Sequence, residues 1–271
     1  MVERVGFVGL GTMGLRMAKN IAHAGFDLTV YDRLEEPLAE MKELGARVAG
    51  SICELAEQSD VIEIAVSPTN EVENVILGPE GILASARAGT VIDSHSTILP
   101  VDIQRIAAEA KRRGVHLLDA QMSGGYRGVE KRTLCFMVGG DAAILERCRP
   151  ILNASGSEVY HLGGIGAGAA TKIAQNTILA GTLVATAEGF ALAKGSGIDL
   201  EVFQDVIHAS AAQSHVADDW MQTWGIRVQP DAYKWILESA LSMGEELDLP
   251  LPASALTKEL IPKILGPRPS S

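Results

Sequence analysis

Near its beginning the chain reads Gly9-Leu10-Gly11-Thr12-Met13-Gly14, directly after a β-branched run at 4–8 and at the start of a helical pattern over 13–24. Glycines at this spacing between a strand and a helix are typical of a turn that binds a dinucleotide. Gly9 permits the tight turn, Gly11 lets a pyrophosphate approach the backbone, and Gly14 lets the helix pack on the strand. The phosphates then meet free N–H groups at the positive end of the helix. The stretch predicts a Rossmann-type fold in which Gly9, Gly11, Thr12, Met13 and Gly14 contact the cofactor.

The spacing alone also fits an ordinary glycine turn, so the residues after the second predicted strand matter. Asp32 ends that strand, where a carboxylate accepts both ribose hydroxyls of NAD and repels the 2′-phosphate of NADP. The alternative for Asp32 is a helix cap. Arg33 lies beside it, and an arginine here can accommodate the 2′-phosphate. We therefore expect NAD as the cofactor, with NADP as the alternative.

Two patterns divide the chain. Up to about residue 160, strand-like runs alternate with amphipathic helical stretches, which predicts a doubly wound, mainly parallel α/β sheet. After residue 168 only helical patterns follow. The predicted domains are therefore 1–162, of Rossmann type, and 163–271, all helical and begun by a long interdomain helix at about 169–195. The predicted strands are 4–8, 28–31, 61–66, 90–93, 116–119, 135–138 and 158–160; the predicted helices are 13–24, 37–44, 51–58, 101–113, 142–152, 169–195, 200–209, 215–224, 231–247 and 253–264.

Composition excludes several functions. The chain has 23 Lys and Arg against 34 Asp and Glu, a formal net charge of −11, so we expect no nucleic-acid or anionic-membrane partner. Its three cysteines form no CxxC pair, which predicts free thiols, mostly buried, in a reducing cytoplasm. The longest uncharged stretch, between Lys172 and Glu188, is too short and polar to span a bilayer. No histidine pair has the spacing of a metal site, so no metal is expected.

Four longer motifs carry a resemblance to a known family. Residues 6–20 read GFVGLGTMGLRMAKN, residues 96–100 read STILP, residues 119–125 read DAQMSGG, and residues 163–176 read GGIGAGAATKIAQN. In this order they closely resemble motifs of the β-hydroxyacid dehydrogenases, the family of 3-hydroxyisobutyrate dehydrogenase, tartronate semialdehyde reductase and 6-phosphogluconate dehydrogenase. The resemblance spans nearly the whole chain.

The resemblance implies a role for Lys172 and Asn176, which lie four apart on one face of the predicted helix. Lys172 is implied as the general base on a substrate hydroxyl in oxidation, and as the general acid in carbonyl reduction. Burial lowers the pKa of an ammonium, which suits this exchange near neutral pH. Asn176 is implied to fix the substrate oxygen or the lysine. The alternative is an ordinary surface lysine in the first turn of a helix.

The remaining predicted contacts follow strands. The hydroxyl of Ser123 and the backbone N–H groups of Gly124 and Gly125 suit a substrate carboxylate, although a simple turn would explain them too. Val66 and Thr97 are expected beside the cofactor at the carboxyl edge of the sheet. The cysteine and histidine spacing, and the lack of a GxSxG turn, disfavour metal and serine-nucleophile chemistry. His95 receives no role, and Asp119 is interpreted as a strand-end or helix-cap carboxylate.

The chain departs from the family pattern in the substrate pocket and the helical domain. Gln121 and Met122 replace a Pro and a Val, and Arg132 stands where a Gly is usual. A late Lys-Asp motif is missing, its positions being held by Trp235 and Ile236. The segment from Ser214 to Tyr233 is shorter than the family pattern, and we expect the family's last helix to be absent after Leu265. These departures concern substrate identity more than hydride transfer.

We therefore expect an NAD(P)-dependent oxidoreductase that acts on a small β-hydroxy acid or the corresponding semialdehyde. The resemblance implies a homodimer or homotetramer. One alternative is an imine reductase on the same scaffold, whose catalytic position carries Asp or Tyr. The other is a dinucleotide-binding module without activity.

Overall fold

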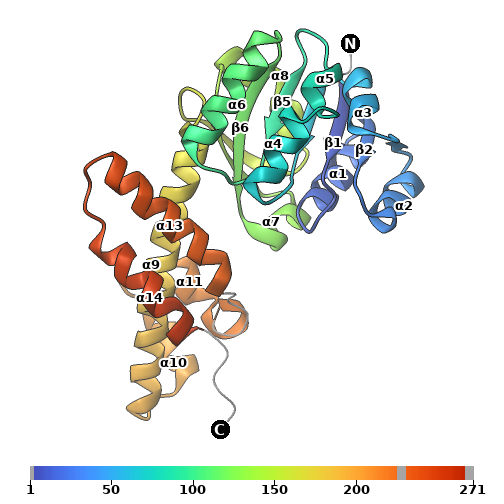
Figure 1. Ribbon diagram of the computed structural model, residues 1–271. Helices are drawn as coiled ribbons and strands as arrows, with labels where there is room; N and C mark the ends of the chain where they lie inside the picture. The colour runs from blue at the N-terminus through green and yellow to red at the C-terminus, as the bar shows by residue number, and fades with distance from the viewer. Residues whose placement is uncertain (1–2, 225–229, 266–271) are drawn as a thin grey trace. The chain divides into compact units, whose positions relative to one another are not determined.

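The computed structural model describes residues 3–224 and 230–265, and its contacts divide the chain into two compact units, Met1–Lys172 and Ile173–Ser271 (Figure 1). The first unit is a sheet covered by helices on both faces. The described part of the second unit is helical throughout. The division lies inside helix α9 (Ala167–Gly195), shortly after the glycine-rich stretch where we placed the domain boundary.

One eight-stranded sheet organises the first unit, with the strand order β3-β2-β1-β4-β5-β6-β7-β8. Neighbouring strands are parallel except β6 and β7, which are antiparallel. The order of the first six strands is that of dinucleotide-binding sheets, so the predicted doubly wound, mainly parallel fold is confirmed. The strands are β1 (Arg4–Val8), β2 (Asp27–Tyr31), β3 (Arg47–Val48), β4 (Val61–Ile64), β5 (Val91–Ser94), β6 (His116–Ser123), β7 (Leu134–Gly139) and β8 (Gly156–His161).

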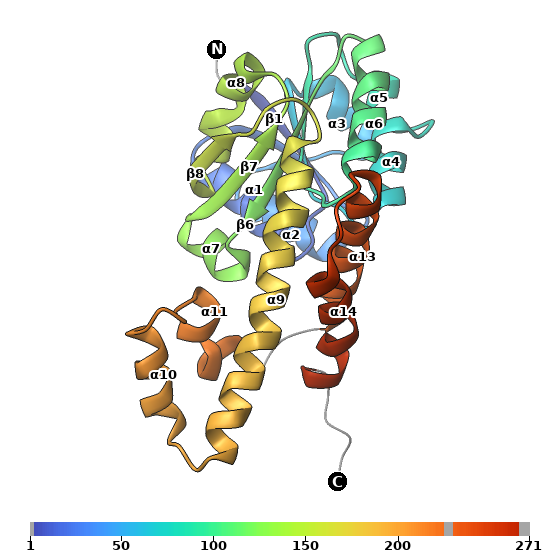
Figure 2. The same ribbon diagram turned by 90° about the vertical axis from the view of Figure 1, so that its left-hand side faces the viewer.

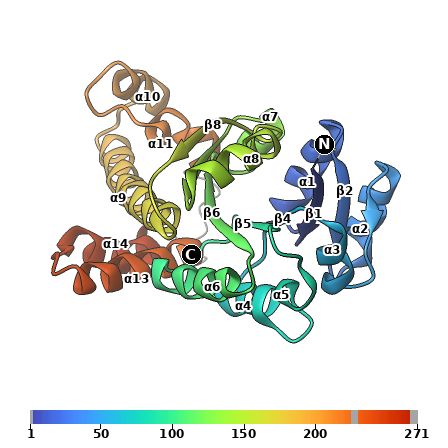
Figure 3. The same cartoon turned by 90° about the horizontal axis from the view of Figure 1, so that it is seen from above.

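Helices cover the two faces of this sheet and bury a separate core on each (Figure 3). On one face α1, α7 and α8 pack around Phe7 and Phe136; on the other α3 to α6 pack around Ile62 and Ile92. Both faces being covered explains why the central strands are apolar without alternation. The helices are α1 (Gly14–His23), α2 (Glu35–Glu43), α3 (Ile52–Gln58), α4 (Thr69–Leu77), α5 (Ile82–Ser85), α6 (Pro100–Arg112), α7 (Gly125–Lys131) and α8 (Ala142–Leu152).

Short elements were not predicted. Strand β3 has only two residues, both exposed, and helices α5 and α7 are too short to show a helical period. The four residues by which β6 exceeds its predicted end pair antiparallel with β7. This extension brings the strand to Ser123, so the predicted substrate loop begins directly at the edge of the sheet.

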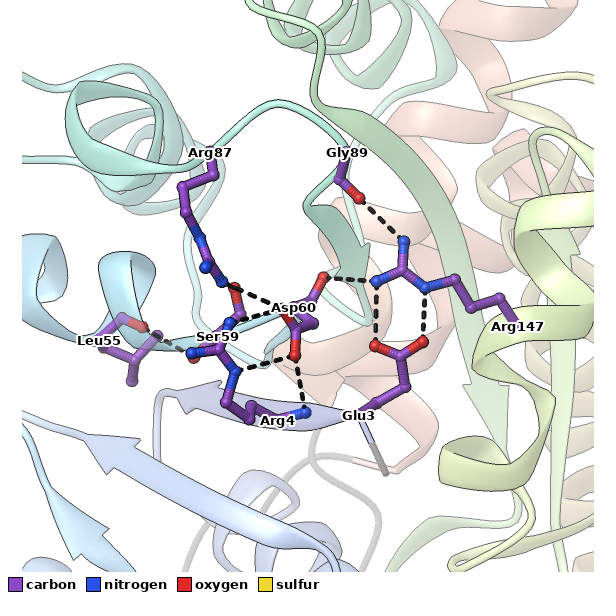
Figure 4. Close-up of polar contacts among 8 residues, drawn as sticks. All are labelled: Glu3, Arg4, Leu55, Ser59, Asp60, Arg87, Gly89 and Arg147. Atoms are coloured by element: carbon purple, nitrogen blue, oxygen red, sulfur yellow. Dashed lines mark hydrogen bonds and ion pairs between the residues drawn. The ribbon is translucent and has the colours of Figure 1, made fainter. Parts of the chain in front are cut away.

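Charged groups tie the amino ends of the strands together (Figure 4). Asp60, just before β4, accepts from Arg4 Nη2 at 2.7 Å and from Arg87 Nη2 at 3.0 Å. These cations lower the pKa of Asp60 to about 2, chiefly through the hydrogen bond from Arg4. Arg147 of α8 pairs with Glu3 at 2.7 Å and also donates to the Asp60 carbonyl at 3.4 Å. These ion pairs and hydrogen bonds stabilise the amino edge of the sheet, opposite the carboxyl edge where the glycine turn lies.

The second unit packs its helices around the C-terminal part of α9 (Figure 2). One side of α9 meets Val216 and Trp220, and another meets Leu237 and Ile261. The predicted helix 215–224 is α11 (His215–Asp218) followed by a π-helical turn, η1 (Trp220–Trp224). The remaining helices are α10 (Leu200–His208), α13 (Pro230–Glu246) and α14 (Pro252–Ile264). The predicted all-helical character is confirmed.

Two expectations from composition need correction. Helix α9 is long and apolar enough to cross a membrane by length and composition, because the helix continues through the polar residues that flank its uncharged stretch. The core helix of a soluble protein passes the same test, so the length and composition of α9 are weak evidence for a membrane span. All three cysteines are free, as predicted, but only Cys148 is buried.

Candidate active site

The three motif glycines differ in surroundings as the turn requires. Gly9 has φ +95°, a conformation that side chains disfavour, and it begins the turn after β1. A Cβ at Gly14 would lie 1.9 Å from the carbonyl oxygen of Gly9, so only glycine allows α1 to start this close to the strand. A Cβ at Gly11 would meet nothing within 4 Å. Gly11 therefore presents bare backbone to open space, which is the cradle a pyrophosphate needs.

A cavity of about 430 Å³ opens at this turn. It brings together eight of the predicted residues: Gly11, Thr12, Met13, Gly14, Val66, Thr97, Gly125 and Lys172. Residues from the ends of β4, β5 and β6 complete the lining: Ala65, Ser67, His95, Ser96 and Met122. This is the carboxyl edge of a parallel sheet, where doubly wound folds bind ligands. The residues present fit a dinucleotide.

Other predicted residues lie outside the lining of this cavity. Gly9 directly follows β1 and Asp32 directly follows β2. Ser123 and Gly124 precede Gly125 at the end of β6. Asn176 lies one helical turn beyond Lys172 in α9 and belongs to the second unit. Its predicted contact with substrate stays a prediction.

Asp32 braces the glycine turn. Its Oδ2 accepts from the backbone N–H of Leu10 at 2.6 Å, and its Oδ1 accepts from that of Leu34 at 2.9 Å. The carboxylate thus ties the first turn to the end of β2. An ionised carboxylate has about four acceptor positions, so two remain for ribose hydroxyls.

Lys172 enters the cavity from the first turns of α9. Its Nζ donates to the carbonyl oxygen of Met122 at 2.7 Å, which holds the amine at the end of β6. Burial lowers the pKa of Lys172 to about 8. A lysine with this pKa exchanges its proton near neutral pH, as an acid–base catalyst must. It is not an ordinary surface lysine.

Asp119 caps the N-terminus of α9, which is the helix-cap role that the sequence analysis gave as one of its two interpretations. Its two oxygens accept from Gly166 N at 2.9 Å and from Ala169 N at 2.8 Å. Burial raises the pKa of Asp119, while these backbone hydrogen bonds oppose the rise. Asp119 also explains why a glycine stands at position 168, shortly before Lys172. A Cβ at Gly168 would lie 2.2 Å from the Asp119 carbonyl oxygen.

Two of the departures from the family pattern have local explanations. Gln121 is buried and its Nε2 donates to the Ser96 carbonyl at 2.9 Å, so it holds the loop that carries Thr97. Arg132 adopts φ +57°, the conformation for which a glycine is suited, and its Nε donates to Asn20 Oδ1 at 3.3 Å.

A buried charged cluster at the wall of the cavity was missed from the sequence, where His95 received no role. His95 Nδ1 bonds the Ala120 carbonyl at 2.7 Å, and its Nε2 directly contacts Glu63. Burial works against a charged His95, but the hydrogen bond and charge of Glu63 raise its pKa to about 9. Burial and the Glu63 charge raise the pKa of Asp93 well above its usual value. The cluster joins β4, β5 and β6, and its His95 lines the cavity. The signal in the sequence was an acidic residue in each of two otherwise apolar strands.

The same three side chains have ligand atoms within 4.8 Å of one another, the spacing of a metal site. His95 Nε2 contacts Glu63 directly, which is the hydrogen-bonded arrangement of a protonated imidazole beside a carboxylate.

Comparison with known proteins agrees with this geometry. Residues 4–163 match the family described as the NAD binding domain of 6-phosphogluconate dehydrogenase. Residues 166–266 match the NAD-binding family of NADP-dependent 3-hydroxyisobutyrate dehydrogenase.

Three proteins illustrate the similarity. The 2-(hydroxymethyl)glutarate dehydrogenase of Eubacterium barkeri is 32% identical over 95% of this chain and 87% of its own length. The NAD-dependent L-serine dehydrogenase of Pseudomonas aeruginosa is 36% identical over 78% of this chain and 70% of its own length. A structure of Mycobacterium tuberculosis 3-hydroxyisobutyrate dehydrogenase with L-serine has a TM-score of 0.86 at 27% identity, covering 97% of this chain and 94% of that one.

Proposed function

Because this chain belongs to the β-hydroxyacid dehydrogenase family and is an NAD(P)-dependent oxidoreductase of small hydroxy acids, we propose that Lys172 transfers the proton in its reaction. The observation that carries the proposal is the position of Lys172, with its pKa lowered to about 8 by burial and its Nζ in the cavity. The nicotinamide, when bound, accepts or donates the hydride.

In the oxidation direction the neutral amine of Lys172 accepts the proton of the substrate hydroxyl. In the reduction direction the ammonium donates that proton to the carbonyl oxygen. The Met122 carbonyl orients the amine, because Nζ donates to it at 2.7 Å. An ammonium has three donors, so this contact leaves others for the substrate.

The substrate class follows from what the relatives have in common. The names 2-(hydroxymethyl)glutarate, L-serine and 3-hydroxyisobutyrate describe acids with a hydroxymethyl group on the carbon next to the carboxylate. We infer the same arrangement for this chain's substrate. The Ser123 hydroxyl and the N–H groups of Gly124 and Gly125 would hold the carboxylate, and Asn176 the reacting oxygen. Gly124 and Gly125, at φ +123° and +57°, shape a backbone turn that side chains would strain.

The cofactor contacts are proposed for the same cavity. Gly11 and the first turn of α1 would hold the pyrophosphate, and Asp32 the adenosine ribose. Val66 and Thr97 would lie at the nicotinamide end. The Val66 N–H donates to Ser96 Oγ at 3.1 Å, which fixes the two loops relative to each other.

The chain has a soluble dehydrogenase fold, and we place it in the cytoplasm as a homodimer or homotetramer. In the second unit Ile178 and Leu192 of α9 are each 73% exposed, which suits a contact with another copy. Analytical ultracentrifugation tests this, and a monomer would contradict it.

Following nicotinamide absorbance across hydroxy acids, aldehydes and imines tests the function. Lys172→Ala should bind NAD+ normally yet lose about 10²–10⁴-fold in turnover. Lys172→Met is the matched variant, because it keeps the stem and removes only the amine. Turnover with imines alone favours an imine reductase, and binding without turnover favours an inactive module. Near-normal turnover of Lys172→Ala would refute the lysine's role.

A further inference from the structure

Two loops at the carboxyl edge of the sheet are joined by an ion pair outside the cavity. Arg33 follows Asp32 after β2, and Glu71 lies in the first turn of α4, just beyond the cavity-lining loop at 65–67. Arg33 Nη1 lies 3.4 Å from Glu71 Oε1. The Arg33 side chain is 74% exposed, whereas that of Glu71 is 24% exposed.

The position of this pair relates to the adenosine ribose. In Rossmann folds the residue after the second strand binds the ribose 2′-OH, and a nearby arginine accommodates the 2′-phosphate of NADP. Here Asp32, Arg33 and Glu71 together carry a formal charge of −1. A 2′-phosphate, itself an anion, would therefore meet a net negative site and an arginine already engaged.

We propose that Glu71 determines the choice of cofactor: by pairing with Arg33 it withholds this cation from a 2′-phosphate, so that the site favours NAD over NADP. The proposal rests on the proposed function only in taking the cavity as the dinucleotide site. Glu71 is a specificity-determining residue and takes no part in proton transfer.

The contacts of Asp32 distinguish its role from that of Glu71. Asp32 accepts from Leu10 N at 2.6 Å and Leu34 N at 2.9 Å, so it cannot be exchanged without loosening the glycine turn. Glu71 has Arg33 as its side-chain ion-pair partner among the described residues. Glu71→Gln keeps the size of the side chain and removes only the charge that holds Arg33.

The test uses binding of adenosine fragments, which needs no turnover. Calorimetry measures 5′-AMP and 2′,5′-ADP against the wild type, Glu71→Gln, Arg33→Ala and the double variant. Glu71→Gln should bind 2′,5′-ADP about tenfold more tightly, about 1.4 kcal/mol, with 5′-AMP within about twofold. In the Arg33→Ala background the same change should give no more than about twofold. NAD+ and NADP+ titrations should show the same ratios.

Glu73→Gln is the matched control, because Glu73 lies on the same helix and pairs with Arg105 instead. It should change neither fragment. An unchanged 2′,5′-ADP affinity in Glu71→Gln overturns the proposal, as does an equal gain without Arg33. Failure of both fragments to bind to every variant overturns the dinucleotide site itself. Fragment binding that follows the expected ratios while no hydroxy acid is turned over supports Glu71's role and refutes the proposed function alone.

Discussion

Alanine at Gly11 and at Gly14 should separate binding from folding within one turn. At Gly11 the new methyl group meets nothing within 4 Å, so the free protein accommodates it. At Gly14 the methyl would lie 1.9 Å from the Gly9 carbonyl oxygen, and a backbone atom cannot rotate away as a side chain can. The same substitution therefore acts on the cofactor at one position and on the fold at the other.

The magnitudes follow from these contacts. The Gly11 methyl occupies space that a pyrophosphate needs, and losing one hydrogen bond to a charged group costs about 1.5–3 kcal/mol. NAD+ affinity should fall roughly tenfold to 150-fold. Overpacking at Gly14 costs about 1–3 kcal/mol. At about 2–4 °C per kcal/mol, the melting temperature of Gly14→Ala should fall by several degrees.

Thermal melts and calorimetric titration with NAD+ are the two assays, performed on both variants and the wild type. Gly11→Ala should melt within about 2 °C of the wild type, because the effect of a surface substitution is small. Gly11→Ala that binds NAD+ within twofold of the wild type would refute the placement of the pyrophosphate. A Gly14→Ala protein with unchanged melting temperature would refute the close-packing argument.

Two further predictions concern stability. Glu63→Gln removes one partner of the buried pair with His95, which should destabilise the fold by about 3–5 kcal/mol. The control Glu73→Gln breaks an exposed pair and should change the melting temperature little. Equal melting temperatures of the two variants would contradict a charged pair between Glu63 and His95. The pKa of Asp60 is lowered from 3.8 to about 2, so its stabilisation is present above pH 3.8 and lost as pH falls toward 2. Asp60→Asn should therefore cost about 1–2 kcal/mol at neutral pH and progressively less in acid, as measured by urea unfolding. A penalty that persists in strong acid would contradict this.

The sequence predicted the parts of the fold that depend on long patterns. Apolar strands and amphipathic helices of nine or more residues were located to within a few positions, because periodicity reveals them. Helix α4 (Thr69–Leu77) was an exception of that length, since it begins in a polar segment after Pro68. The two-residue β3 and the four-residue α5 are held by tertiary contacts and have no pattern of their own.

The site shows the same division. The glycine motif and Lys172 predicted residues that line the cavity. The backbone of the turn requires glycine, and the burial of Lys172 distinguishes it from a surface lysine. The pairing of Glu63 with His95 joins positions 32 residues apart, and a single sequence does not reveal such register. Gln121 departs from the family pattern in sequence, and only the structure shows the hydrogen bond to the Ser96 carbonyl that accounts for it. Asn176 and the missing Lys-Asp motif concern the second unit, so their effect on the substrate stays a prediction.

The pH dependence of kcat/KM tests the central claim, that Lys172 transfers the proton. Burial lowers its pKa to about 8, and only the neutral amine can accept a proton. For oxidation of a small hydroxy acid that the chain turns over with NAD+, kcat/KM should rise about tenfold per pH unit below the pKa and level off above it. For the reverse reduction, which needs the ammonium, kcat/KM should instead fall above it. Profiles with no inflection near pH 8, or an inflection that survives with full turnover in Lys172→Ala, would contradict the account.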